Sequence, residues 1–447
     1  MTADLQDPLR PLRTGWAFGF FNATNWMIVL GPPLVLLAQQ MGASTLQVGL
    51  IYSAVFLLLP VQIISTAVLP RLGYKRQALL GWVTRIFFLI IPLVLIVQKP
   101  AGSGGWPVYW LMLAMFGFCS ARSFGAAALM PWLYAIIPPA HQGRYFATDQ
   151  SISGVGAILA LGLCILLFYL LEPYDAFFWQ YIAATTGALL SLYFMFRLPN
   201  GGKPKLISLR TVFTQSPRIL FATPRIRYYF IIHLLAGLVG LAFTPFTTFY
   251  LKAVRGMEDS LVLIYASCAM VGTIGGAWVL RTISDSISVR TQTRVFCLFQ
   301  WVVVAWWLAY LLGPDGIVYS LPLAYLLSGV AASFWVNAHL KYLPQLAAEE
   351  DRPLTISVFS ASVGFIGGFF PILWGAVLKT EDADLAMNLP AFVGYFLVSV
   401  IIYGILYRML GRLEEMDVDH TALNSHWSWY RPHRYVAKLI NLVEPKQ

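Results

Sequence analysis

A single arginine lies at the centre of a long apolar run, where its charge requires a hydrogen-bonding or charged partner. Arg122 is flanked by small residues in the segment GFCSARSFGAAA, residues 117–128. It lies roughly 15 residues, or about 22 Å of helix, from either end of its apolar segment, too deep to reach water along the lipid. The side chain is therefore expected to face the interior of a helix bundle. Two interpretations stay open: it bonds carbonyl groups and holds helices together, or it offers a donor fork to a carboxylate or phosphate.

Titratable groups that could exchange a proton are scarce in the apolar segments. None of the 20 Asp and Glu residues falls in the middle of one, and Asp149 stands at the start of the fifth. His233 and His339 lie near segment ends, where each is either a satisfied core histidine or a group that titrates near neutral pH. These three residues are the candidates for coupling to protons. Arg85 is only about eight residues into its segment and is expected to extend its head to the nearer surface.

Amide side chains mark two further segments. Asn22 and Asn25, three residues apart, are expected to share a helical face in FFNATNWMIV. Asn337 stands beside Trp335 in a later segment, SFWVNAH. Because an unpaired amide is costly in hydrocarbon, each Asn should face another helix or a central cavity.

The elements that position these residues are membrane-spanning helices. The chain of 447 residues is 58% hydrophobic and 11% charged, with a mean hydropathy of +0.69. Continuously apolar runs of about 20 residues indicate helices, because a β-barrel would show short alternating segments. Twelve spans are predicted, at residues 14–39, 46–69, 77–98, 107–136, 148–171, 176–197, 227–252, 258–280, 291–313, 317–343, 354–379 and 390–411.

The basic residues predict the orientation of these spans. If both termini share one side, that side holds 24 of the 30 Lys and Arg residues, so both termini are predicted to be cytoplasmic. The N-terminus lacks the apolar core of a secretory signal, and the first span is expected to direct insertion. The positive charge is thus explained by topology, and no nucleic-acid partner is expected. The protein is expected in the cell membrane, which is the inner membrane if the cell is Gram-negative.

An internal repeat divides the chain. At an offset of 213 residues Pro32 matches Pro245, and Pro131 matches Pro344. The predicted fold is therefore an all-α integral membrane protein whose twelve helices form two pseudo-symmetric six-helix halves. The predicted units are the first half at 1–197, a cytoplasmic loop at 198–226, the second half at 227–411 and a cytoplasmic tail at 412–447.

Three local patterns resemble the major facilitator superfamily. MGASTLQVGLIYSA, residues 41–54, is similar to the family's entry into the second helix. PRLGYKRQ is similar to its basic loop between helices two and three, although Pro70 replaces the usual aspartate. RSFGAAA, from Arg122, resembles its fourth-helix motif. The fifth span lacks the Gly-Pro pair of the family's drug–proton antiporters.

The resemblance implies roles for particular residues. In the family the basic loop forms a charge latch that helps select the conformational state, and the matching residues here are Arg71, Gly73, Lys75 and Arg76, with a degenerate second copy at Asp285 and Arg290. Topology alone is the other interpretation of these cations. Helices one, four, seven and ten line the family's cavity. The substrate-binding candidates are therefore Arg122, Asn22, Asn25, Thr247, Trp335 and Asn337, with a bond to its own helix backbone as the favoured alternative for Thr247.

These observations favour a permease that moves a small organic solute by alternating access, either as a secondary active symporter or antiporter or as a facilitative transporter. A small organic anion is the first substrate expected, with an uncharged sugar-like or amphiphilic solute as the second. A non-transporting assembly factor, sensor or lipid- or pigment-handling protein of the same fold is the alternative class. No phosphate-binding loop or nucleophile motif occurs, so no enzyme is expected. The four cysteines lie in apolar spans, so neither a metal nor a cofactor is expected, and the partners are a small solute and membrane lipids around a monomer.

Overall fold

The architecture is a bundle of long helices. The computed structural model describes residues 9–66, 68–100, 105–137, 142–202, 218, 223–283, 287–346, 352–378 and 385–413, and it contains no strand in these ranges. Eleven helical segments are long and apolar enough to cross a membrane. The 25-residue helix α10 (Pro173–Arg197) supplies the twelfth crossing and is more polar, with Gln180 fully buried. The all-helical membrane fold predicted from the sequence is confirmed.

Each predicted span corresponds to one long helix or to a run of consecutive shorter helical segments. The first half contains α1 (Arg13–Leu30), α2 (Pro32–Gln40), α3 (Thr45–Leu57), α4 (Leu59–Ser65), α5 (Leu69–Leu72), α6 (Tyr74–Phe87), α7 (Ile90–Gln98), α8 (Trp106–Ile136), α9 (Gln142–Leu170) and α10. The second half contains α12 (Pro224–Phe249), the π-helical turn η4 (Tyr250–Val254), α13 (Asp259–Ile283), α14 (Val289–Leu312), α15 (Leu321–Tyr342), α16 (Arg352–Gly367), α17 (Phe369–Val377) and α18 (Leu385–Leu410). The boundaries of units 1–197, 198–226, 227–411 and 412–447 stay a prediction, and the tail from residue 414 lies outside the described residues.

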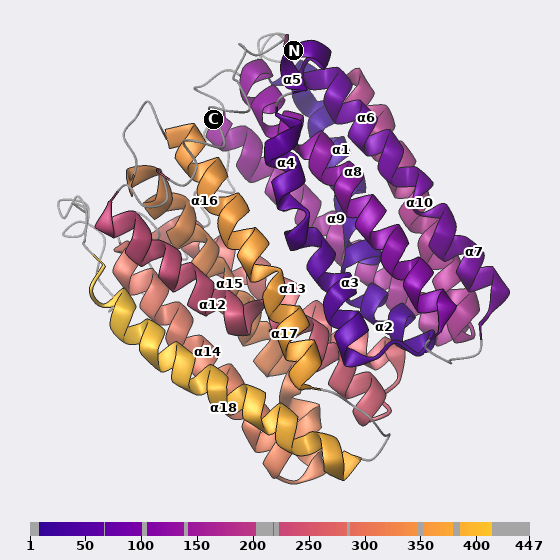
Figure 1. Cartoon of the computed structure of the whole chain (residues 1–447), viewed down its shortest axis with the longest axis vertical. Helices are drawn as coiled ribbons and strands as arrows, with labels where there is room; N and C mark the ends of the chain where they lie inside the picture. The colour runs from indigo at the N-terminus through magenta and orange to yellow at the C-terminus, as the bar shows by residue number, and fades with distance from the viewer. Residues whose placement is uncertain are drawn as a thin grey trace, which may run out of the picture.

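The two halves lie side by side (Figure 1). Because each half crosses an even number of times, α1 begins and α18 ends at one end of the bundle, called here the near end; the other is the far end. The halves are packed tightly towards the far end, where α3 meets α17. The Thr45 hydroxyl donates to the Gly375 carbonyl at 3.0 Å, and a Cβ at Gly49 would lie 2.4 Å from the Pro371 carbonyl oxygen.

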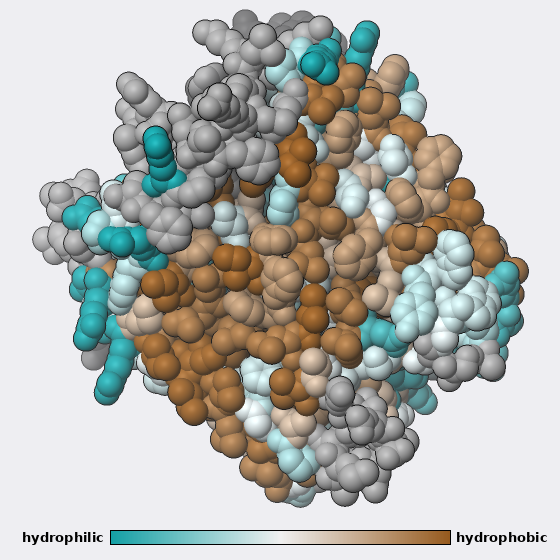
Figure 2. Space-filling model, viewed as in Figure 1, coloured by the Kyte–Doolittle hydropathy of each residue, from teal (hydrophilic) through white to brown (hydrophobic). Residues whose placement is uncertain are grey.

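The outer surface suits a hydrocarbon environment. Figure 2 shows hydrophobic side chains covering most of the visible flank, with hydrophilic residues gathered towards the ends. Large apolar side chains stand outside the core, including Phe87 at 64% exposed and Ile401 at 61% exposed. In water such a surface would be unfavourable, so these residues are expected to contact lipid tails.

Candidate functional site

The candidate site is built around a close crossing of α6 and α8. A Cβ on Gly81 would lie 2.5 Å from the Cα and backbone N of Gly125, so only two glycines allow this approach. Gln77 on α6 donates to the Phe124 carbonyl of α8 at 3.1 Å and to the Ser65 carbonyl of α4 at 3.0 Å. The small-residue motif after Arg122 therefore has a packing function, because it lets two helices touch backbone to backbone.

This crossing sets the depth of two arginines. Arg85 comes four residues after Gly81, and Arg122 comes three residues before Gly125. Consecutive spans run in opposite directions, so both positions lie beyond the crossing on its far-end side, by about 6 Å and about 4.5 Å at 1.5 Å per residue. The two guanidinium groups act on each other electrostatically. A pair of like charges thus lies inside the first half.

Arg85 does not extend to the near surface, and that expectation was wrong. Its side chain is only 1% exposed and points into the bundle. The guanidinium carbon lies 4.7 Å from the ring centre of Trp82 and 5.5 Å from that of Phe118. Its Nη2 donates to the Asn22 Oδ1 at 2.9 Å, whereas its Nε is buried without an acceptor in the described part of the chain. The aromatic faces and the Asn22 amide stabilise the charge inside the bundle.

Arg122 lies over the face of Trp26 on α1, with its guanidinium carbon 4.2 Å from the ring centre. The side chain is half-buried. Within the described residues its guanidinium makes no hydrogen bond or ion pair, and its nitrogens are not among the buried atoms that lack a partner. They therefore reach open space. The cation is held by an aromatic face, and its donor edge stays available for a ligand.

Asn22 and Asn25 serve different neighbours. The Asn22 Oδ1 accepts from Arg85 and also from the Trp82 Nε1 at 3.2 Å, which joins α1 to α6. Asn25 is fully buried, and its Nδ2 donates to the Ala184 carbonyl of α10 at 3.0 Å. Asn22 thus orients Arg85, whereas Asn25 holds two helices together in this conformation.

No acid balances the two arginines among the residues that the structure describes. The ion pairs there, Lys99–Asp175 at 2.7 Å and Lys252–Asp259 at 2.8 Å, both lie at the far end. We call Asn22, Trp26, Trp82, Arg85 and Arg122 the cationic cluster. A cluster with two fixed positive charges and unused donors can bind an anion, because each charge-assisted hydrogen bond is stronger than a neutral one.

The second-half candidates from α12 and α15 make local contacts. The Thr247 hydroxyl donates to the Phe243 carbonyl at 2.7 Å, which is the backbone bond favoured from the sequence. The Asn337 Nδ2 donates to the Gln292 Oε1 of α14 at 2.7 Å. Both side chains therefore support helix packing in this conformation.

The two histidines that the sequence marks as coupling candidates lie together in an aromatic cluster. The rings of His233 on α12 and His339 on α15 have centres 4.6 Å apart, and Trp335 lies 4.7 Å from His233. The Nδ1 of His233 faces the Tyr229 carbonyl at 3.1 Å, and the Nδ1 of His339 faces the Tyr229 hydroxyl at 3.3 Å. A carbonyl only accepts, so Nδ1 of His233 carries its proton, and its buried Nε2 lacks a partner in the described residues. Phe359 of α16 closes the cluster.

The third coupling candidate, Asp149, lies on α9 against α1. A Cβ on Gly19 would come 2.2 Å from the Asp149 Oδ1 and 2.8 Å from the Ser153 hydroxyl, so the glycine makes room for the carboxylate. Asp149 is half-buried. It belongs to a different helix interface from the histidine pair.

The basic loop has the geometry that its glycine predicts, with φ +77° at Gly73, in the left-handed region. Arg71 and Arg76 are exposed. The Lys75 Nζ donates to the Leu198 carbonyl just after α10 at 2.7 Å, where a cation complements the helix dipole.

The same contact recurs in the second half. The Arg290 Nη2 donates to the Leu413 carbonyl just after α18 at 2.5 Å, and both members of the pair are shifted by 215 residues from Lys75 and Leu198. The repeat inferred from the sequence thus has a matching pair of contacts. Asp285 lies outside the described residues.

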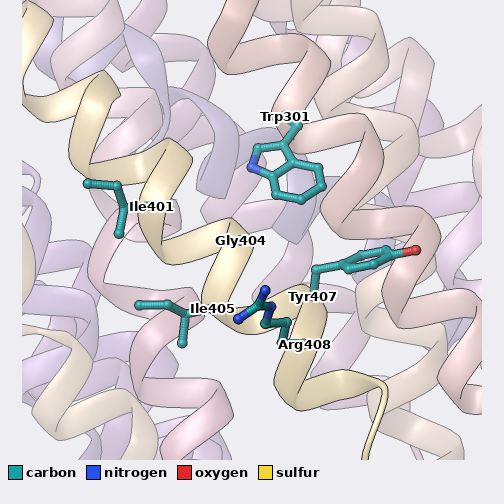
Figure 3. Close-up of a pocket in the computed structure, with 6 residues that line it drawn as sticks. All are labelled: Trp301, Ile401, Gly404, Ile405, Tyr407 and Arg408. Atoms are coloured by element: carbon teal, nitrogen blue, oxygen red, sulfur yellow. The ribbon is translucent and has the colours of Figure 1, made fainter.

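A groove on the outer surface is separate from the predicted site. It has a volume of about 380 Å³ and is lined by α14 and α18 residues, among them Trp301, Ile405 and Arg408 (Figure 3). Ile405 is exposed to the surroundings, so the groove faces the lipid side of the helix pair. No group of three His, Cys, Asp or Glu side chains that could hold a metal ion occurs in the described residues.

These features define a polytopic helical membrane protein with a cationic cluster inside its first half. The chain belongs to the Major Facilitator Superfamily, whose family model matches residues 15–371. The resemblance inferred from the sequence is confirmed.

Solved transporters share this fold. A mutant of the nucleoside transporter NupG is 16% identical, with 89% of this chain and 99% of that chain covered and a TM-score of 0.70. A POT family transporter in complex with a peptide conjugate is 13% identical, with 90% and 94% covered and a TM-score of 0.66. The xylose transporter XylE from E. coli is 11% identical, with 92% and 97% covered and a TM-score of 0.62. At these identities the likeness concerns the fold alone. No curated protein sequence matches the chain.

Proposed function

We propose that this protein is a secondary transporter that moves a small organic anion across the cell membrane by alternating access. The observation that carries the proposal is Arg122, a half-buried cation deep in the bundle whose donor edge has no acceptor in the described residues. The carboxylate or phosphate of a substrate would supply that acceptor. The proposal places the near end in the cytoplasm, where positively charged loops are favoured. A monomer suffices, because the cluster lies within one half.

The packing of the halves supports an inward-facing state. Contacts such as Thr45 with Gly375 close α3 against α17 towards the far end. Two of the solved structures with this fold, homologues of Spinster and of ferroportin, are described as inward-facing. In the transport cycle the α3–α17 contact opens while the near end closes, so that the substrate meets one side at a time.

An uptake panel tests the proposal. Purified protein in liposomes should accumulate small carboxylates or phosphate esters, and uncharged analogues of equal size should neither enter nor compete. Nucleosides and xylose are useful neutral probes, because transporters of this fold carry them. Uptake of a neutral solute unaffected by excess anion would contradict anion selectivity. Absence of flux for every solute, together with a co-purifying membrane protein, would instead support the non-transporting class.

The proposal assigns proton coupling to the pair His233–His339. The rings lie in contact on α12 and α15 of the second half, and Tyr229 and Tyr342 are the other titratable groups in their cluster. Imidazole is the side chain whose ordinary pKa lies closest to neutral pH. Anion uptake should therefore rise several-fold with an alkaline-inside pH gradient, because a proton enters with each anion.

Replacement of His339 by Gln is expected to abolish this stimulation while uptake without a gradient persists. The matched control is Tyr342→Phe, which keeps a ring in the same cluster and removes no group that titrates near neutral pH. Uptake is measured with and without the imposed gradient. Undiminished stimulation in the His339→Gln protein would contradict coupling through the histidines and move it to Asp149.

A further inference from the structure

We infer that Arg85 and Arg122 form one two-cation site that binds a doubly charged oxyanion, either a phosphate monoester or a dicarboxylate. This inference rests on the proposed function and narrows its substrate class. Only Arg122 stood out in the sequence as a deep charge. The Gly81–Gly125 crossing places Arg85 on the same side at a similar depth, so the site contains two cations.

Unused donors give both arginines spare hydrogen-bonding capacity for a ligand. Arg85 is 99% buried, yet its Nε has no acceptor in the described residues, while its Nη2 is held by the Asn22 amide. Arg122 contributes a donor edge that reaches open space beside Trp26. A guanidinium has five N–H donors in a fixed fork that matches carboxylate and phosphate oxygens. The two forks together can satisfy several oxygens at once.

The charge balance favours a dianion over a monoanion. Two cations at this depth repel each other, and no carboxylate pairs with either of them in the part of the chain that the structure describes. A monoanion leaves one positive charge uncompensated, whereas a dianion neutralises both. The low-dielectric surroundings of Trp26, Trp82 and Phe118 amplify this difference, because charges interact more strongly away from water.

The neutral character of Asn22 keeps the site cationic. Its Oδ1 orients Arg85 through a hydrogen bond without cancelling the charge. An aspartate at the same position would form an internal ion pair with Arg85. It would therefore compete with the substrate for the cation that the structure leaves unbalanced.

Calorimetric titration of the purified protein tests the inference with four probes. These are glycerol 3-phosphate and succinate as dianions, propionate as a monoanion and glycerol as a neutral control, all at pH 7.5. Wild-type protein should bind at least one dianion about tenfold to hundredfold more tightly than propionate. Preference for glycerol 3-phosphate would identify a phosphate ester, and preference for succinate a dicarboxylate. Equal affinity for dianions and propionate would overturn the inference.

Three variants locate the effect. Arg85→Gln should reduce dianion affinity about tenfold or more and leave propionate affinity nearly unchanged. Asn22→Asp should also reduce dianion affinity about tenfold or more and leave propionate affinity nearly unchanged. The Asn22→Asp protein should melt at an equal or higher temperature, which separates charge neutralisation from unfolding. Arg408→Gln removes an exposed arginine from the outer groove and should leave the affinity for all four probes unchanged.

The outcomes separate this inference from the proposed function. If Arg85→Gln and Asn22→Asp both leave the dianion preference intact, the two-cation site is refuted, and anion transport through Arg122 still stands. If no anion binds to wild-type protein, or if Arg122→Gln binds anions normally, the proposed function itself fails.

Discussion

Replacement of Arg122 by Gln is expected to lower anion uptake by about 30-fold or more in liposomes. Truncating one partner of a buried charge-assisted pair costs roughly 2–5 kcal/mol of binding free energy. Here the truncated partner is Arg122, the cation whose N–H donors have no acceptor in the described residues. The glutamine keeps much of the side-chain volume and can still lie against Trp26. The loss should therefore reflect charge and donor geometry more than packing.

The stability of the same variant distinguishes the two interpretations of Arg122. If Arg122 serves the substrate, the variant should melt at an equal or higher temperature, because the arginine makes no hydrogen bond or ion pair in the described residues that the variant would lose. Arg408→Gln, the same change on an exposed face of α18, is the matched control and should retain uptake. A well-folded Arg122→Gln protein with normal uptake would exclude a role in binding. A lower melting temperature in parallel with lost uptake would assign the residue to helix packing.

The spans were predictable because hydrocarbon imposes a length on every crossing. The predicted fourth span, residues 107–136, differs by one residue from α8 (Trp106–Ile136). The repeat was also visible, and the equivalent contacts of Lys75 and Arg290 now support it. The thickness of the hydrocarbon core and the preference for Lys and Arg in cytoplasmic loops constrain each segment separately. Both effects can therefore be recognised in a single sequence.

The direction of a side chain around its helix was harder to predict. Arg85 lies near enough to the helix start to reach the surface, yet it points inwards, because Gly81 one turn earlier is pressed against Gly125. The depth of a residue in the membrane does not indicate the direction in which its side chain points around the helix axis. The spacing of each arginine from a glycine on the neighbouring span was the signal that could have revealed the pair.

Asn22 and Asn25 illustrate the same difficulty. At 3.6 residues per turn, positions three apart differ by about 60° around the axis, which is enough to face two different neighbours in a crowded bundle. Asn22 bonds to α6, and Asn25 bonds to α10. Identifying a shared face from sequence requires knowing where the neighbouring helices lie, and that information is tertiary.

The Gly81–Gly125 crossing leads to the second large expected effect. Gly81→Ala places a methyl group 2.5 Å from the Gly125 backbone and 2.7 Å from the Ala121 carbonyl oxygen. A backbone neighbour cannot rotate away as a side chain can, so α6 and α8 must separate. Overpacking of this kind costs about 1–3 kcal/mol. The melting temperature should fall by several degrees, and anion uptake should fall with it, because the separation also displaces Arg85 and Arg122 relative to each other.

Gly162→Ala is the matched control for this experiment, since it makes the same change in α9 where nothing lies within 4 Å of the new Cβ. Alanine is the better helix former by roughly 1 kcal/mol, so this variant should be unchanged or slightly more stable. Both proteins are compared by thermal melting and by anion uptake. A Gly81→Ala protein with wild-type melting and uptake would mean that α6 and α8 do not touch at this point. The shared depth of Arg85 and Arg122 would then lose its physical cause, because the glycine contact is what brings the two cations to one site.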